Sequence, residues 1–322
     1  MATPDAAVKE FMSDKKNFAD AYNLFLFQKN LVDPNRLEQL NPNLVSVLFG
    51  DQDKKFRQSV ERTLDDMMKA MVLMDDGRIT YLMLGSQYQI DVHNAMPVRN
   101  LLESGLLYAQ QVKEIGRRNQ ELSRSDPELR RQLNRSGAFL SGVLPTDRLH
   151  PVIILVMYFG EQEWDGPLSL REMLTEADQE FLKYSCDYKI NLVTPQHIPE
   201  LPEGQDSELW KLMTVLAAGR KRGKNLLSLA GDRRFESVSN NTVRLINTLL
   251  KTNIRFNQTE GGEINMCSAW KEIQAELAEK ERLSQENDRY RQENSRYQQA
   301  VMQKDREIER LRAIMKQNGL QF

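Results

Sequence analysis

An Asp-Gly pair separates two apolar runs in the first third of the sequence. The runs cover residues 67–74 and 79–84, and Asp76-Gly77 lies between them. Asp-Gly between runs that favour β-strands is typical of a two-residue type I′ turn, because that turn needs positive φ at both central residues. The stretch therefore predicts an antiparallel hairpin, and any fold of this chain must place two adjacent strands here.

The strand pairing of this hairpin follows from its turn. With Asp76-Gly77 as the two-residue loop, Asp66 lies directly opposite Gln87. Residues opposed in this way have Cβ atoms about 4.5–5.5 Å apart. Side chains alternate between the two faces of a strand, so Gln89 shares the face of Gln87. The predicted pairing gathers Asp66, Gln87 and Gln89 into one polar site at the end of an apolar hairpin.

The PD-(D/E)XK nucleases have an Asp on the first strand of a hairpin and a carboxylate-x-Gln or carboxylate-x-Lys motif on the second strand. The predicted hairpin resembles this layout. The wider sequence resembles the PD-(D/E)XK nuclease family transposases, which are close to the bacterial recombination-promoting nucleases (Rpn). The similarity covers roughly residues 15–270. The stretches that carry it are FADAYN (18–23), DDMMKA (65–70), LGSQYQIDVHNAMPVRN (84–100), FLSG (139–142), PVIILVMYFGEQEWDGPLSLREML (151–174), DYKINLVTP (187–195) and RLINTLL through INMCSAW (244–270).

The resemblance implies an α/β fold with a restriction-endonuclease-like mixed sheet flanked by helices. It also implies a transposase-associated DNA endonuclease that hydrolyses phosphodiester bonds with Mg²⁺ or Mn²⁺. The implied catalytic residues are Asp66, Gln87 and Gln89, with Asp20 contributed by the first helix. Asp66 and Asp20 are the implied metal ligands. Without the resemblance, Asp20 is a solvated residue on the polar side of that helix.

One position departs from the family pattern. The family has Glu-x-Gln on the second strand, whereas this chain has Gln87-Tyr88-Gln89. Mg²⁺ is held by carboxylates together with water and substrate phosphate, and it polarises the phosphoryl oxygen. Gln87 carries no charge, so metal affinity falls and the bound water is harder to deprotonate. We therefore expect a weakened endonuclease; the alternative is a catalytically inactive nuclease-fold protein that binds DNA or protein and dimerises through a coiled coil.

Contacts with DNA must come from local basic groups, because the net charge of the chain is only −2. Arg99 lies beside the end of the second hairpin strand, where it either pairs with local carboxylates or contacts a DNA phosphate. The basic segment 219–224 either touches a phosphate backbone or is a solvated connection between helices. Its candidate residues are Arg220, Lys221, Arg222 and Lys224.

Periodicity predicts the remaining elements. Pro97 begins a helix of about four turns, and residues 114–135 are a polar mobile loop or solvated helix. The apolar run 152–159 predicts a central strand covered on both sides, 168–182 a helix and 189–193 a short strand. The apolar stripe of the helix after Pro97 consists of Val98, Leu101, Leu102, Gly105, Leu106, Ala109 and Val112.

The C-terminal segment 270–317 contains no Gly or Pro and repeats itself at a period of seven, QENDRYR followed by QENSRYQ. A heptad pattern sustained over four repeats indicates a coiled coil, and Asn at a positions favours a parallel pair of helices. We expect a homodimer through residues 270–317; the alternative is a single long, partly disordered helix. The d positions are Leu283, Tyr290, Tyr297 and Leu311, and the a positions are Asn287, Asn294, Val301, Ile308 and Met315.

Composition predicts a globular cytoplasmic protein. Hydrophobic residues make up 40% of the chain, which is enough for a packed core. Cys186 and Cys267 lie far apart, which fits a reducing compartment without a disulfide framework. The longest apolar run is far shorter than the ~20 residues of a membrane helix. The expected domains are a flexible N-terminus (1–16), a nuclease-like α/β domain (17–200), a helical extension packed on it (201–265) and the coiled coil (266–322).

Overall fold

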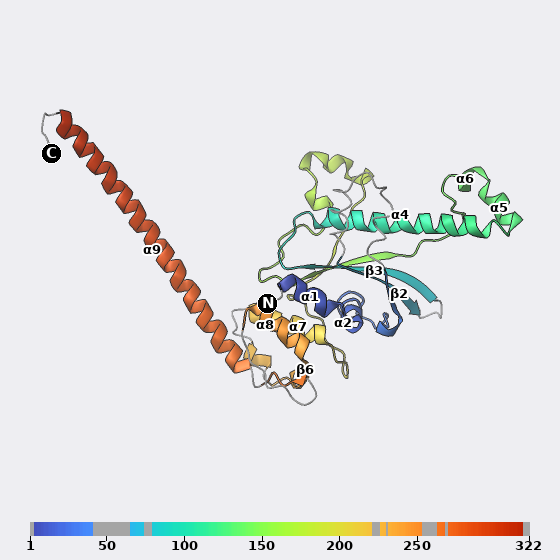
Figure 1. Cartoon of the computed structure of the whole chain (residues 1–322), viewed down its shortest axis with the longest axis horizontal. Helices are drawn as coiled ribbons and strands as arrows, with labels where there is room; N and C mark the ends of the chain where they lie inside the picture. Colours follow the sequence, from blue (N-terminus) through green and yellow to red (C-terminus); the bar gives the residue numbers. More distant parts are fainter. Residues whose placement is uncertain are drawn as a thin grey trace.

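A five-stranded mixed sheet lies at the centre of the structure, with helices on both of its faces (Figure 1). The computed structural model describes residues 3–40, 65–73, 79–220, 226–229, 231–252, 263–267 and 270–317. The predicted α/β class and the mixed sheet flanked by helices are confirmed. The strands, in spatial order, are β1 (Leu37–Gln39), β2 (Asp66–Leu73), β3 (Ile79–Gln89), β4 (Val152–Tyr158) and β5 (Asn191–Val193), antiparallel from β1 to β3 and parallel from β3 to β5.

The interior strand β4 agrees with its prediction. Ile154, Val156 and Tyr158 are buried on one face and Leu155 and Met157 on the other. A run of β-branched and aliphatic residues without alternation is what a strand covered on both faces requires. The short strand β5 was also predicted, and it pairs with β4.

The hairpin forms, but its predicted register is wrong by one residue. Asp66 pairs with Ser86, not with Gln87, and the ladder ends at Leu73 and Ile79. The Asp-Gly signal located the turn but not its length, because five residues separate the two strand ends. The predicted loop Asp76-Gly77 lies outside the described residues. A shift of one residue moves every side chain to the other face, so Asp66 and Gln87 are on opposite sides of the sheet.

One helix covers the first face of the sheet and several cover the second (Figure 1). On the first face, α4 (Met96–Leu122) packs Leu106 and Leu107 against Met67 and Met83. The second face carries most of the core, which includes buried residues of all the helices there. These helices are α1 (Pro4–Met12), α2 (Lys15–Asp20), the π-helical η1 (Ala21–Phe27), α7 (Glu208–Arg220) and α8 (Asn240–Leu250).

The expected flexible N-terminus is wrong. Thr3 caps α1 and accepts a hydrogen bond from the amide of Ala6. Val8, Phe11 and Met12 of α1 are buried in the main core. The first twelve residues look polar in sequence, yet their apolar side chains recur at helical spacing and meet α8.

α4 differs from its prediction in length and in orientation. It continues for 27 residues rather than four turns. Four members of the predicted apolar stripe, Val98, Leu102, Gly105 and Ala109, are exposed. The buried side is instead largely polar, and its members include Asn100, Glu103, Ser104, Gln110, Gln111 and Asn119. Amphipathicity therefore gave the wrong face of this helix, because a polar surface is buried against β3 and β4.

Shorter elements complete the body. The predicted helix over 168–182 is two 3₁₀ segments, η4 (Arg171–Met173) and η5 (Glu176–Tyr184). Residues after α4 form α5 (Pro127–Leu133) and α6 (Ser136–Phe139), so the region predicted as a loop or solvated helix is mostly helical. The other elements are η2 (Pro34–Arg36), η6 (Leu226–Leu229), η7 (Arg233–Phe235), and the two-stranded sheet of β6 (Val238–Ser239) and β7 (Glu263–Ile264).

The last helix, α9 (Trp270–Gln317), projects away from the body as a single rod (Figure 1). Trp270 anchors its first turn, because this indole is fully buried and its ring centroid lies 5.5 Å from that of Phe235. Pairing of α9 with a second copy stays a prediction. Across the described residues, no helix combines the length and apolarity that crossing a membrane requires.

Candidate functional site

Asp66 lies at the start of β2, on the face covered by α1. The hydroxyl of the buried Tyr88 donates to Asp66 Oδ2 at 2.8 Å. Burial raises the pKa of Asp66, and the hydrogen bond from Tyr88 opposes that shift. Its neighbour Asp65 accepts from the Tyr88 amide at 2.8 Å and pairs with Lys9 Nζ at 2.9 Å. Asp65 and Asp66 are therefore both bonded to other groups of the chain itself.

Gln87 lies on the opposite face, beneath α4. Its Nε2 donates to both carboxylate oxygens of Glu103, and neither side chain is exposed. Arg99 Nε lies 3.8 Å from Glu103 Oε1, one helical turn away. The ion-pair interpretation of Arg99 is thus the one that the structure supports. We call Gln87, Arg99, Asn100 and Glu103 the α4 polar cluster.

The α4 polar cluster is incompletely hydrogen-bonded. Within the described part of the chain, Gln87 Oε1 and both polar side-chain atoms of Asn100 are buried without a partner. Buried polar atoms usually have partners, so unsatisfied ones mark sites with a special role or with unseen water. Gln89, two residues after Gln87 on the same face, is half-buried at the end of β3.

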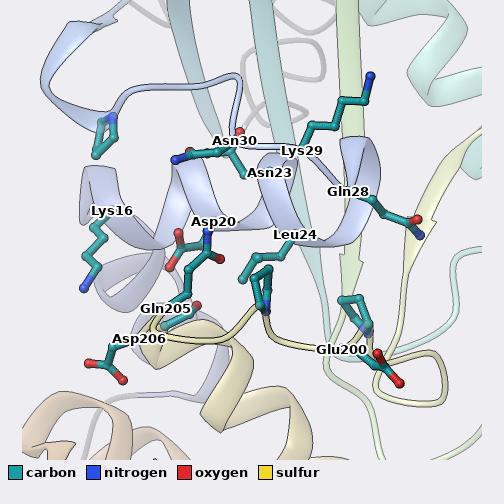
Figure 2. A pocket seen from close by; sticks show the side chains of 14 residues that line it. Lys16, Asp20, Asn23, Leu24, Gln28, Lys29, Asn30, Glu200, Gln205 and Asp206 are labelled. Atoms are coloured by element: carbon teal, nitrogen blue, oxygen red, sulfur yellow. The ribbon is translucent and has the colours of Figure 1, made fainter.

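Asp20 lies in a separate cavity (Figure 2). The cavity has a volume of about 570 Å³ and lies between the α2–η1 segment and residues 199–207. Figure 2 shows Asp20 close to Gln205, with Lys16 and Asp206 nearby. Asp20 Oδ2 is buried and has no hydrogen-bond partner among the described residues. Burial raises the pKa of Asp20, and a hydrogen bond with Ser207 opposes the shift.

These positions do not converge on one point. Asp66 is absent from the lining of the Asp20 cavity, and Gln87 is on the far face of the sheet from Asp66. In the described segments, no group of three or more His, Cys, Asp or Glu side chains is arranged to hold a metal ion. The predicted ligand pair Asp66 and Asp20 therefore does not fit a shared Mg²⁺ or Mn²⁺, and we derive no step through such an ion.

The remaining DNA-binding candidates stay predictions. The side chain of Arg220 lies outside the described residues, as do Lys221, Arg222 and Lys224 entirely. Sequence reasoning also missed two residues that the structure makes important, Glu103 and Tyr88. Glu103 had a signal, because it follows Arg99 by four residues, the spacing of an ion pair on a helix.

Comparison with known proteins assigns no family to the chain: no protein-family model, no curated protein and no solved structure matches it.

Proposed function

We propose that this protein is a nuclease-fold DNA-binding protein that cleaves DNA poorly or not at all and acts as a dimer through α9. The observation that carries the proposal is the register of the β2–β3 hairpin, which separates Asp66 from Gln87. Hydrolysis by this class of nuclease needs carboxylates and substrate phosphate around one metal ion. With Asp66 and Gln87 on opposite faces of the sheet, the hairpin does not supply that arrangement.

The state of Gln87 supports the same conclusion. Its amide nitrogen is committed to Glu103, inside an interface that excludes water. A group in that position reaches neither a scissile phosphate nor an attacking water unless α4 moves. The nuclease-like fold itself is proposed from the mixed sheet and from the acidic and Gln-x-Gln strands that form its hairpin.

The dimer is proposed from the surface of α9. Five large apolar side chains in the described part of α9 are between 47% and 63% exposed, and each of these five occupies an a or d position of the heptad. A single helix cannot bury such a seam, whereas a parallel pair buries it and sets Asn287 and Asn294 against their own copies. The exposed seam residues are Leu283, Tyr290, Tyr297, Val301 and Ile308.

The second candidate function is a weak endonuclease dependent on Mg²⁺ or Mn²⁺. The observation in its favour is the carboxylate of Glu103, which contacts Gln87 where the family motif has its own Glu. Asp65 lies at the same end of the hairpin, where its carboxylate accepts from the Tyr88 amide. A rearrangement of α4 would bring these acidic groups to the same end of the sheet.

One experiment separates the two functions. Binding of a fluorescent duplex and nicking of supercoiled plasmid in Mg²⁺ and Mn²⁺ are measured for the unmodified chain, Asp66→Ala and Gln87→Glu. We expect salt-dependent binding without nicking by the unmodified chain. Nicking that Asp66→Ala abolishes would establish the endonuclease instead. Absence of any DNA affinity at low salt would refute the DNA-binding proposal.

A further inference from the structure

The segment 113–148 forms a lobe at the far end of α4, away from the sheet (Figure 1). It comprises the second half of α4, then α5, α6 and the return to β4. We call it the arginine lobe, because it holds eight Lys and Arg residues against five Asp and Glu. The chain as a whole has a net charge of −2, so this lobe is a local exception to the charge of the protein.

The arginine lobe has a defined shape. Gly142 has a φ of +69°, and a Cβ at this position would lie 2.9 Å from Gly116 Cα, so two backbones are in close contact. Asn119 Nδ2 donates to the Gly142 carbonyl at 2.9 Å and to Asp147 Oδ2 at 2.7 Å. The Arg130 guanidinium donates to the carbonyls at the end of α4, 3.1 Å from Ser123 O and 2.9 Å from Arg124 O. The lobe is therefore fixed to α4.

The arginine lobe presents two large apolar side chains to solvent. Phe139 is 71% exposed and the adjacent Leu140 is 92% exposed. Phe139 is the last residue of α6 and Leu140 follows it, whereas Ala138 of α6 is buried. Single exposed apolar residues are ordinary, but an adjacent Phe and Leu on a fixed projection form a contact surface. Nothing in the described part of the chain covers them.

The arginine lobe also carries several exposed arginines. Arg124 and Arg135 are exposed, and so are Arg117, Arg118 and Arg131. The last three pair with carboxylates at 2.8–3.4 Å. Exposed pairs of this kind contribute little, so a polyanion can replace their carboxylates at small cost. A partner must therefore offer closely spaced negative charge together with apolar faces.

We propose that the arginine lobe binds nucleic acid, with its arginines on the phosphates and Phe139 and Leu140 against the bases. Phosphates supply the repeated negative charge, and base faces supply the apolar surface that Phe and Leu side chains contact when inserted between base steps. An acidic protein surface matches the charge but offers no stack of flat faces. This inference rests on the proposed DNA binding and locates it at a surface away from the hairpin and from 219–224.

The test measures two properties of the full-length chain with a duplex that carries 2-aminopurine. Affinity is read from anisotropy across a salt series, and base unstacking from 2-aminopurine fluorescence. Arg124→Glu with Arg135→Glu is expected to weaken binding and to reduce the salt slope by about two. Phe139→Ala with Leu140→Ala is expected to lose the fluorescence change and to weaken binding about tenfold, the size of one base–aromatic contact. Circular dichroism confirms that each variant is folded.

Lys16→Glu with Lys29→Glu is the matched control, because it makes the same charge change beside the Asp20 cavity, on the face of the sheet opposite α4. Lobe variants that bind as tightly as this control would overturn the role of the lobe while leaving DNA binding in place. Failure of the unmodified chain to bind would overturn the proposed function and the lobe together. An unchanged 2-aminopurine signal in the variant with Phe139→Ala and Leu140→Ala would overturn base insertion by the lobe.

Discussion

Gln87 and Glu103 face each other across the contact between β3 and α4, and both side chains are fully buried. The pair joins a neutral amide to a carboxylate, with the Arg99 guanidinium 3.8 Å from the carboxylate. The Glu103 carboxylate can be buried beside Gln87 because the amide N–H groups of Gln87 donate to it. The identity of residue 87 therefore determines how much charge lies beneath α4.

Gln87→Glu is expected to destabilise the protein by about 3 kcal/mol at pH 8, because it buries two carboxyl groups in contact. One of the two must hold a proton in the folded state that it releases on unfolding, so the loss becomes smaller as the pH falls toward 4. Urea unfolding at pH 5 and pH 8 measures the effect. Glu103→Gln is the control, with a change of about 1 kcal/mol or less. Equal losses for both variants would contradict the explanation.

The variant Asp66→Asn is expected to become more stable than the unmodified chain as the pH increases. Burial raises the folded-state pKa of Asp66 above 3.8, so its contribution is fully present below that pH and is lost as the pH rises through the folded-state pKa. The Asn side chain keeps an oxygen that accepts the hydrogen bond from Tyr88, but it does not titrate. The gain is below about 1 kcal/mol, because the carboxyl is partly solvated. Thermal unfolding from pH 3 to pH 8 tests this, and a pH-independent difference would refute it.

Gly142→Ala is expected to loosen the arginine lobe. The alanine would need a φ of +69°, and its Cβ would lie 2.9 Å from the backbone of Gly116. The combined cost is about 2 kcal/mol, and faster hydrogen exchange across residues 123–148 would reveal it. The matched control is Gly137→Ala, since a Cβ there has no atom within 4 Å. Unchanged exchange in Gly142→Ala would show that the close backbone contact does not hold the lobe.

Lys211→Met is expected to destabilise the protein by about 3 kcal/mol, as removal of one partner from a buried ion pair does. Lys211 Nζ lies 2.6 Å from Asp206 Oδ1 and 2.8 Å from Glu208 Oε1, and it donates to the Ser237 carbonyl at 2.6 Å. Met fills the same space but leaves Glu208 and Ser237 without this donor. Urea denaturation provides the measurement. Lys189→Met serves as the control, and a similar small loss in both variants would argue against the network.

Tyr297→Lys with Val301→Lys is expected to make the chain monomeric at micromolar concentration, because charges at d and a positions oppose helix pairing. Gln292→Lys, at an exposed f position, is expected to leave the dimer intact. Sedimentation equilibrium distinguishes these states. A monomeric unmodified chain would refute the proposed coiled coil.

Local chemistry predicted some elements well and others poorly, and the physical reasons differ. β4 was predictable because its run of aliphatic residues admits only a strand covered on both faces. The pairing of Asp66 was not predictable, because a one-residue change in turn length moves its partner from Gln87 to Ser86. The buried face of α4 could not be predicted either, because Asn and Glu are usually surface residues, yet Asn100 and Glu103 are both fully buried here.

The candidate site illustrates the same limit. The hairpin, Asp66 and Gln87 were found from sequence, but their separation depends on which face each occupies. The position of Asp20 depends on residues 199–207, which are distant in the sequence. Periodicity describes single elements, whereas a site depends on how several of them meet.

α4 is long and continuous, so its two ends move together. Glu103 lies near the start of α4 and Asn119 near its end, in one unbroken helix of 27 residues that is about 40 Å long. Proline occurs only in the first turn, so the helix has no proline kink that would absorb a rotation. A partner that turns the arginine lobe therefore also turns Glu103 against Gln87. The arginine lobe and the α4 polar cluster lie at the two ends of one continuous helix, so a rotation of the lobe is transmitted to the cluster.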